Sequence, residues 1–161
     1  MMDWSRFGHR PDSVKIILLF ATILVLLSTS AAIYQPVGTG IIWTTGILAL
    51  TSNLLSILIL GTGLEHIFAS HKYRTITWSL FEVLISLLYA ILYFISIWIC
   101  VHGANYGSTT AFGVAGFFCV INFFVYLYNF FLYIQIWMRE MRVANEQMTP
   151  TFENAVSYGA P

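Results

Sequence analysis

Residues 117–137, FFCVINFFVYLYNFFLYIQIW, decide how this chain must fold. Ten of these 21 residues are aromatic, and none carries a formal charge. The run is about as long as the ~20 apolar residues that an α-helix needs to cross a bilayer. Two amides, Asn122 and Asn129, nevertheless lie within it. Because an amide buried without partners costs several kcal/mol, their positions indicate which side of the helix faces other protein.

Three more long apolar runs precede this one. The chain has 161 residues, of which 58% are hydrophobic and only 9% are charged, whereas soluble domains carry about 25% charged residues. We therefore predict one all-α membrane domain, residues 14–138, and no separate soluble domain. The predicted spans are residues 14–34, 41–69, 76–101 and 111–138.

Short polar segments flank the predicted membrane domain. Residues 1–13 form the N-terminal segment, and residues 139–161 form a tail. The tail is expected to begin as a helical extension from Arg139 and to end that helix at Thr149-Pro150, because proline disfavours helix in the residue before it. The remainder of the tail is then expected to be flexible.

The cations predict the orientation of the chain in the membrane. With four spans, both termini and the loop between spans two and three lie on one side of the bilayer. All seven Lys and Arg residues fall on that side, and the loops at 35–40 and 102–110 carry no formal charge. The positive-inside rule therefore predicts cytoplasmic N- and C-termini.

Polar and small residues recur along the spans at alternating intervals of three and four, which places them on one helical face. The third and fourth spans give the strongest pattern, the second also has one, and the first has a weaker one through Thr22, Val25 and Thr29. Such a face belongs against other helices rather than lipid. We therefore predict an antiparallel four-helix transmembrane bundle with left-handed packing. The predicted inter-helix polar seam comprises Asn53, Glu82, Ser86, Tyr89, Tyr93, Asn122, Tyr126 and Asn129.

Ionisable residues near the cytoplasmic loop allow two interpretations. Glu82 lies within the third span, and a second group, predicted to form a polar cluster at the inner interface, comprises Glu65, His66, Lys72 and Arg74. One interpretation is a structural tie between helices. The other is a proton or cation site, because acids inside membranes are often functional.

Three phenylalanine pairs repeat about every seven residues along the fourth span. They are Phe117 and Phe118, Phe123 and Phe124, and Phe130 and Phe131. We interpret them as a face that contacts lipid or a partner, with a bound sterol or phospholipid as the candidate ligand. The sequence has no phosphate-binding glycine loop, no metal-ligand spacing and no basic nucleic-acid face, so we expect neither an enzyme nor a cofactor, a metal or a nucleic-acid partner.

Two stretches resemble the second half of a MARVEL domain. They are FEVLISLLYAILYFISIWICV (81–101) and TAFGVAGFFCVINFFVYLYNFF (110–131), while RPDSVKIILLF (10–20) resembles the approach to the first span of that family. The resemblance covers about residues 10–138. It implies a multi-pass protein of the plasma membrane or of vesicles that organises a membrane subdomain, a cell junction or a trafficking vesicle through lateral contacts with lipid, other membrane proteins or further copies. The alternative is a small transporter or channel, or its auxiliary subunit, that uses Glu82 and the polar seam.

Overall fold

The computed structural model describes residues 13–62, 78–106 and 108–157, with side chains described up to residue 145. These ranges contain four α-helices and no strand. The helices are α1 (Ser13–Ser30), α2 (Thr39–Thr62), α4 (Trp78–Ala104) and α5 (Thr109–Ser157). All four are long and apolar enough to cross a membrane, so the prediction of an all-α, multi-pass membrane protein is confirmed.

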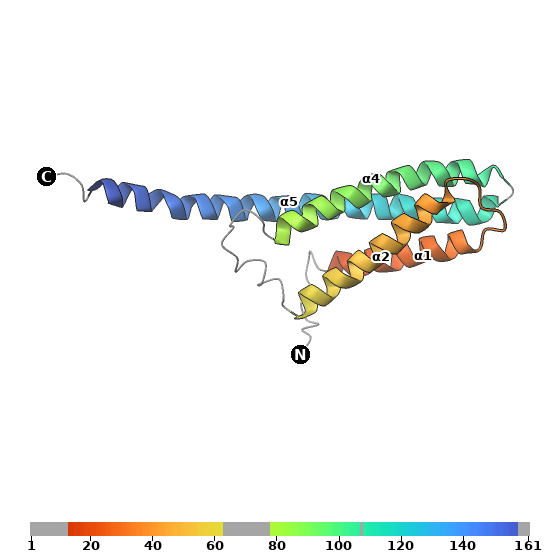
Figure 1. Ribbon diagram of the computed structural model, residues 1–161, viewed down its shortest axis with the longest axis horizontal. Coiled ribbons are helices and arrows are strands. Elements are labelled where there is room, and N and C mark those ends of the chain that lie inside the picture. The colour runs from red at the N-terminus through yellow and green to blue at the C-terminus, as the bar shows by residue number, and fades with distance from the viewer. Residues whose placement is uncertain (1–12, 63–77, 107, 158–161) are drawn as a thin grey trace.

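The helices differ greatly in length, and this sets the outline of the molecule. Helices α1, α2 and α4 lie beside the first part of α5, while the second part of α5 continues well past their ends (Figure 1). With 49 residues, α5 is about 73 Å long at ~1.5 Å per residue. The hydrocarbon core of a bilayer is about 30 Å thick, so much of this helix lies outside the membrane.

Several helix ends differ from the predicted ones, and three of the differences are informative. Helix α1 ends at Ser30, before the predicted residue 34, and α4 continues to Ala104 instead of ending at residue 101. The prediction that Thr149-Pro150 ends the last helix is wrong, because α5 continues to Ser157. A proline removes one backbone hydrogen bond and disfavours helix, but it does not always end one. Residues 63–69 of the predicted second span lie outside the described ranges.

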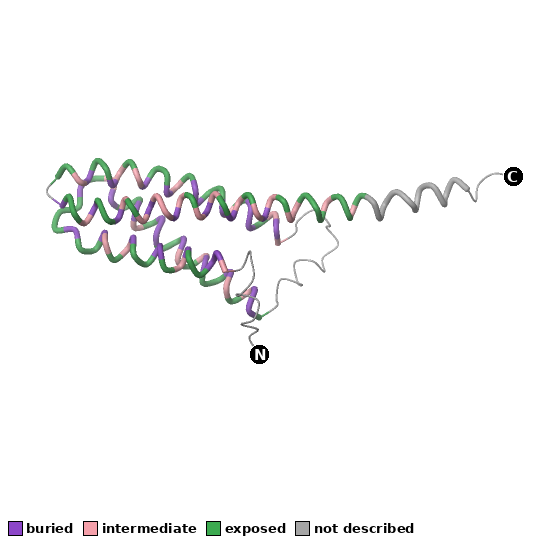
Figure 2. Tube along the Cα trace, turned by 180° about the vertical axis from the view of Figure 1, so that it is seen from behind, coloured by how far each residue is buried: buried purple, intermediate pink, exposed green. Residues whose placement is uncertain are grey.

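Burial follows one stripe along each helix, and polar side chains occupy much of that stripe. Every residue of the predicted polar seam is buried, and the buried stripes of the four helices face one another (Figure 2). Leu, Ile, Phe and Val side chains dominate the outward surface. This arrangement is the reverse of that in a soluble protein, and it suits a surface that contacts lipid.

Close contact between α4 and α5 depends on small residues at one end of the pair. A Cβ atom added at Gly103 would lie 3.1 Å from the ring of Phe112, and one added at Gly116 would lie 3.2 Å from Cβ of Cys100. Phe112 and Cys100 are both buried. Small residues at such positions allow membrane helices to approach closely, so this end of the interior has little room for larger side chains.

Candidate functional site

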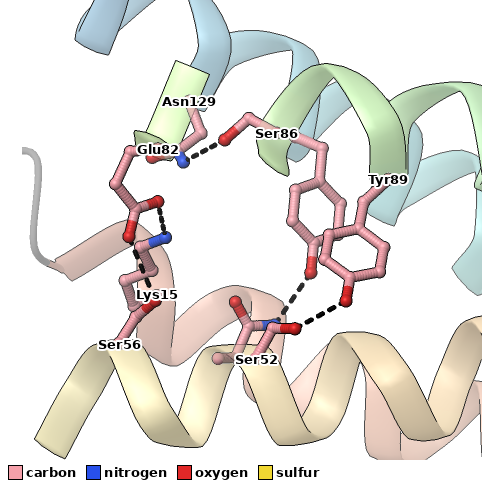
Figure 3. Close-up of polar contacts among 9 residues, drawn as sticks. Lys15, Ser52, Ser56, Glu82, Ser86, Tyr89 and Asn129 are labelled. Atoms are coloured by element: carbon pink, nitrogen blue, oxygen red, sulfur yellow. Dashed lines mark hydrogen bonds and ion pairs between the residues drawn. The ribbon is translucent and has the colours of Figure 1, made fainter. Parts of the chain in front are cut away.

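A buried ion pair lies near the N-terminal ends of α1 and α4. The ammonium of Lys15, on α1, forms a salt bridge with the carboxylate of Glu82, on α4. The hydroxyl of Ser56, on α2, donates a hydrogen bond of 3.0 Å to the other carboxylate oxygen, and Figure 3 shows the three side chains converging. The Lys15 ammonium also lies 5.9 Å from the ring centroid of Tyr133, on α5. One charge pair therefore connects all four helices.

The local sequence explains why both charges point inward. Lys15 lies seven residues before Thr22, so the two occupy the same side of α1 after two turns. Glu82 is related in the same way to Tyr89 on α4, and all four residues are buried. Opposite charges inside a medium of low dielectric attract strongly, and their desolvation is offset only when both are paired and hydrogen-bonded.

The two asparagines of α5 make different contacts. Asn129 donates from Nδ2 to Ser86 Oγ on α4 at 2.7 Å, and its Oδ1 is buried without a hydrogen-bond partner among the described residues. Asn122 donates from Nδ2 to the carbonyl oxygen of Phe118 at 3.1 Å, within its own helix. Its Oδ1 accepts a hydrogen bond of 3.4 Å from Thr22 on α1. Each amide therefore connects α5 to one other helix.

Three tyrosines form the middle of the polar interior. The hydroxyls of Tyr89 and Ser52 lie 2.6 Å apart, and Asn53 Nδ2 donates to the hydroxyl of Tyr126 at 2.9 Å. The hydroxyl of Tyr93 lies 3.1 Å from that of Thr22. The ring of Tyr126 lies 5.2 Å from that of Tyr89 and 5.7 Å from that of Tyr93, measured between centroids. These spacings are typical of aromatic pairs that stabilise a core.

The chemistry available to this interior is limited by its charge balance. Lys15 and Glu82 neutralise each other, and the other contacts join hydroxyls, amides and one backbone carbonyl. No group of three or more His, Cys, Asp or Glu side chains that could hold a metal occurs in the described ranges. The arrangement is suited to holding four helices in one register, because polar pairs lose their partners when a helix slides.

The structure separates the members of the predicted lipid or partner face. Phe117, Phe124 and Phe131 are exposed, whereas Phe118, Phe123 and Phe130 are half-buried. Phe118 and Phe123 pack against the core cluster. The two members of each pair therefore differ in exposure, because adjacent residues on a helix point about 100° apart. A lipid or partner face along these pairs stays a prediction. The predicted inner-interface residues, Glu65, His66, Lys72 and Arg74, lie outside the described ranges.

Sequence reasoning missed Lys15 as the partner of Glu82. It grouped this lysine with the cations outside the membrane, whereas the side chain is buried in the interior. A signal for this position is present in the sequence. The weak polar face of the first span, through Thr22, Val25 and Thr29, reaches Lys15 when it is extended back by seven residues.

Comparison of the chain with protein-family models, curated proteins and solved structures gives no match in any of the three. The function must therefore be inferred from the chain's own residues and contacts. Two features are informative: a polar interior whose charges balance, and an outer surface of large apolar side chains.

Proposed function

We propose that this chain is a MARVEL-type protein of the plasma membrane or of vesicles, and that it organises a membrane subdomain through lateral contacts with lipid and other membrane proteins. The observation that carries this proposal is the division between interior and surface. The deep polar side chains bond to one another or to backbone carbonyls, with Asn129 Oδ1 as the described exception, while the outward faces carry large apolar and aromatic groups. Such a molecule offers contacts at its lipid-facing surface rather than a reactive centre.

Aromatic side chains are spread over the outward faces of three helices. The exposed members include Phe20 on α1, Phe81, Phe94 and Trp98 on α4, and Phe117, Phe124 and Phe131 on α5. In lipid, helices associate through shape, close packing and hydrogen bonds, because lipid tails are as apolar as the side chains themselves. Rigid rings supply large contact areas at a low cost in conformational entropy, so these faces support association with other membrane proteins.

The proposed topology follows from helix number and charge. Four spans with connections as short as residues 31–38 and 105–108 favour antiparallel neighbours, and the spacing of the buried residues favours left-handed packing. Apart from Lys15, whose side chain is buried among the helices, the Lys and Arg residues of the sequence then lie on one side of the membrane with both termini. We propose that this side is the cytoplasm.

The proposal is tested by following single fluorescent copies in the plasma membrane of living cells. We expect confined, slow diffusion and clusters that contain other membrane proteins, because the outward aromatic faces provide lateral contacts. A designed four-helix membrane bundle of similar size, with leucine on its outward faces, is the control. Diffusion as fast and unconfined as that of the control would contradict the proposal.

The ion pair between Lys15 and Glu82 favours a second candidate function, proton or cation transport, because charged groups inside membranes often belong to ion pathways. The carboxylate of Glu82 is already occupied by Lys15 and Ser56, so we expect transport to be absent. Proteoliposomes that contain the purified protein, under a pH or potassium gradient, should leak no faster than empty liposomes. A flux that disappears in Glu82→Gln would instead establish transport.

A further inference from the structure

Two cysteines meet between α4 and α5, far along α4 from the ion pair. Cys100 lies one turn before α4 ends at Ala104, and Cys119 lies on α5. Their side chains are 1% and 0% exposed, and both are free thiols. A hydrogen bond joins the two thiols, so their sulfur atoms are close neighbours in the interior.

The packing of α4 against α5 explains this contact. A Cβ added at Gly103 would contact the ring of Phe112. The earlier residue Cys100 instead lies beside the later residue Gly116, so the contacts progress in opposite directions along the two helices. Cys119 follows Gly116 by three residues and therefore lies on the same side of α5. Because Cβ atoms tilt toward the N-terminus of their own helix, Cys100 and Cys119 lean toward each other.

The surroundings keep the two thiols near each other. A Cβ added at Gly116 would lie only 3.2 Å from Cβ of Cys100, so the backbone of α5 comes close to this cysteine. Both cysteines belong to the buried core cluster. A disulfide needs Cα atoms within about 7 Å of each other, and this close backbone approach favours such a distance. The sequence has two cysteines in all, so each has one possible partner within the chain.

We propose that Cys100 and Cys119 are an oxidisable pair, which hydrogen peroxide converts into a disulfide that joins α4 to α5. In the first step, the sulfur of one cysteine attacks a peroxide oxygen and the O–O bond breaks, which forms a sulfenic acid and a water molecule. In the second step, the other thiol attacks the sulfenic sulfur, and a second water leaves as the S–S bond forms. The thiols lose two electrons and two protons, and the peroxide is reduced to water.

Burial determines both the rate and the product of this oxidation. Buried thiols react slowly, and a protein oxidant in solution has no access to side chains that are almost completely covered. Hydrogen peroxide is small and uncharged, which suits such a site. Once one sulfenic acid has formed, the second thiol is already beside it, so we expect a disulfide in preference to a sulfinic acid. The oxidation should therefore be slow but specific.

The disulfide would restrict the helices that it joins. It closes a loop through residues 101–118, which contains the connection between α4 and α5. A cross-link of this kind restricts the unfolded chain and thereby stabilises the folded one. Oxidation would therefore fix the contact between α4 and α5 at the end where small residues already bring them close.

Thiol labelling of the full-length protein in liposomes tests the proposal. The protein is treated with hydrogen peroxide, the peroxide is removed with catalase, and the protein is denatured with a maleimide before its intact mass is measured. We expect a monomer that has lost both labelling sites together and regains both after dithiothreitol. A sample denatured before the peroxide step shows which exposure oxidises accessible thiols. If the folded protein keeps both thiols free at that exposure, or loses them irreversibly as sulfinic acids, the proposal is wrong.

A displaced thiol is the matched control. Cys119→Ser combined with Val120→Cys keeps two cysteines at nearly the same depth, but it turns the second one by about 100° around α5. We expect several-fold less intrachain disulfide from this variant than from the wild type. Equal yields from the two proteins would show that the contact between Cys100 and Cys119 does not direct the oxidation, and would overturn the proposal.

Thermal unfolding in detergent gives a second readout. We expect the oxidised wild type to unfold at a temperature several degrees above that of the reduced protein, because the cross-link restricts the unfolded chain, and dithiothreitol should reverse the change. Cys100→Ser cannot form the disulfide, so peroxide should not raise its unfolding temperature, and this variant also accounts for oxidised methionines. A disulfide that lowered the unfolding temperature relative to this variant would contradict the proposed fit between the two cysteines.

Discussion

Substitution of Glu82 by glutamine is expected to lower the free energy of unfolding by about 3–5 kcal/mol, the usual effect of removing one partner from a buried ion pair. The substitution keeps the shape of the side chain but leaves the Lys15 ammonium buried without a counter-charge. Because the pair connects α1 to α4 and Ser56 of α2 also bonds to the carboxylate, the loss is expected to affect the whole interior. Unfolding of the protein in bicelles with denaturant measures it.

A double variant without either charge shows how much of the expected loss of stability comes from the unpaired charge of Lys15. Lys15→Met combined with Glu82→Met removes both charges, and we expect it to be more stable than Glu82→Gln alone, because neither charge then needs a partner. The matched control is Glu140→Gln, which removes an exposed carboxylate on α5 that accepts a hydrogen bond from Ser79. Its effect should stay below about 1 kcal/mol. If Glu82→Gln were no more damaging than this control, the ion pair would not hold the helices together.

Replacement of Tyr126 by alanine is expected to be the second most damaging change, at about 3–5 kcal/mol, the range for large-to-small substitutions of buried aromatic residues. The side chain is 1% exposed and packs between the rings of Tyr89 and Tyr93. Its loss leaves a cavity and also removes the acceptor of the Asn53 hydrogen bond. Thermal unfolding in detergent, followed by circular dichroism, measures the change.

A milder substitution at the same position separates packing from hydrogen bonding. Tyr126→Phe keeps the ring and removes the hydroxyl, so the amide of Asn53 loses its acceptor, at an expected loss of about 1–3 kcal/mol. Phe124→Ala is the matched control, because it removes an exposed ring from the same helix and should change stability little. Equal effects of Tyr126→Ala and Phe124→Ala would mean that the buried ring of Tyr126 stabilises the protein no more than an exposed ring does.

The inward-facing residues were predictable because helical spacing carries that information. Asn122, Asn129 and Tyr126 share one side of their helix in the sequence, and all three are buried. The pairing of Lys15 with Glu82 was not predicted, because its partners lie 67 residues apart and a lysine near the start of a span is also typical of the membrane surface. Spacing identifies a face, but it does not identify which residue on another helix meets it.

The phenylalanine pairs illustrate the same limit within one helix. Their seven-residue repeat was recognised, but Phe117 and Phe118 point in different directions, and only the first is exposed. The length of α5 was missed for a different reason. Pro150 was weighed as a helix end, although the surrounding residues include good helix formers such as Glu, Gln, Met and Ala. Local propensity on both sides therefore outweighed the single missing hydrogen bond.

The sequence separation within the ion pair has a consequence for biosynthesis. At about 5–20 residues per second, a ribosome needs roughly 3–13 s to add the 67 positions that separate Lys15 from Glu82. During that interval Glu82 has not yet been made, so Lys15 lacks its counter-charge. The first helix therefore cannot complete its final packing until α4 has been made, and a chain that stops between them leaves the charge of Lys15 unmatched by Glu82.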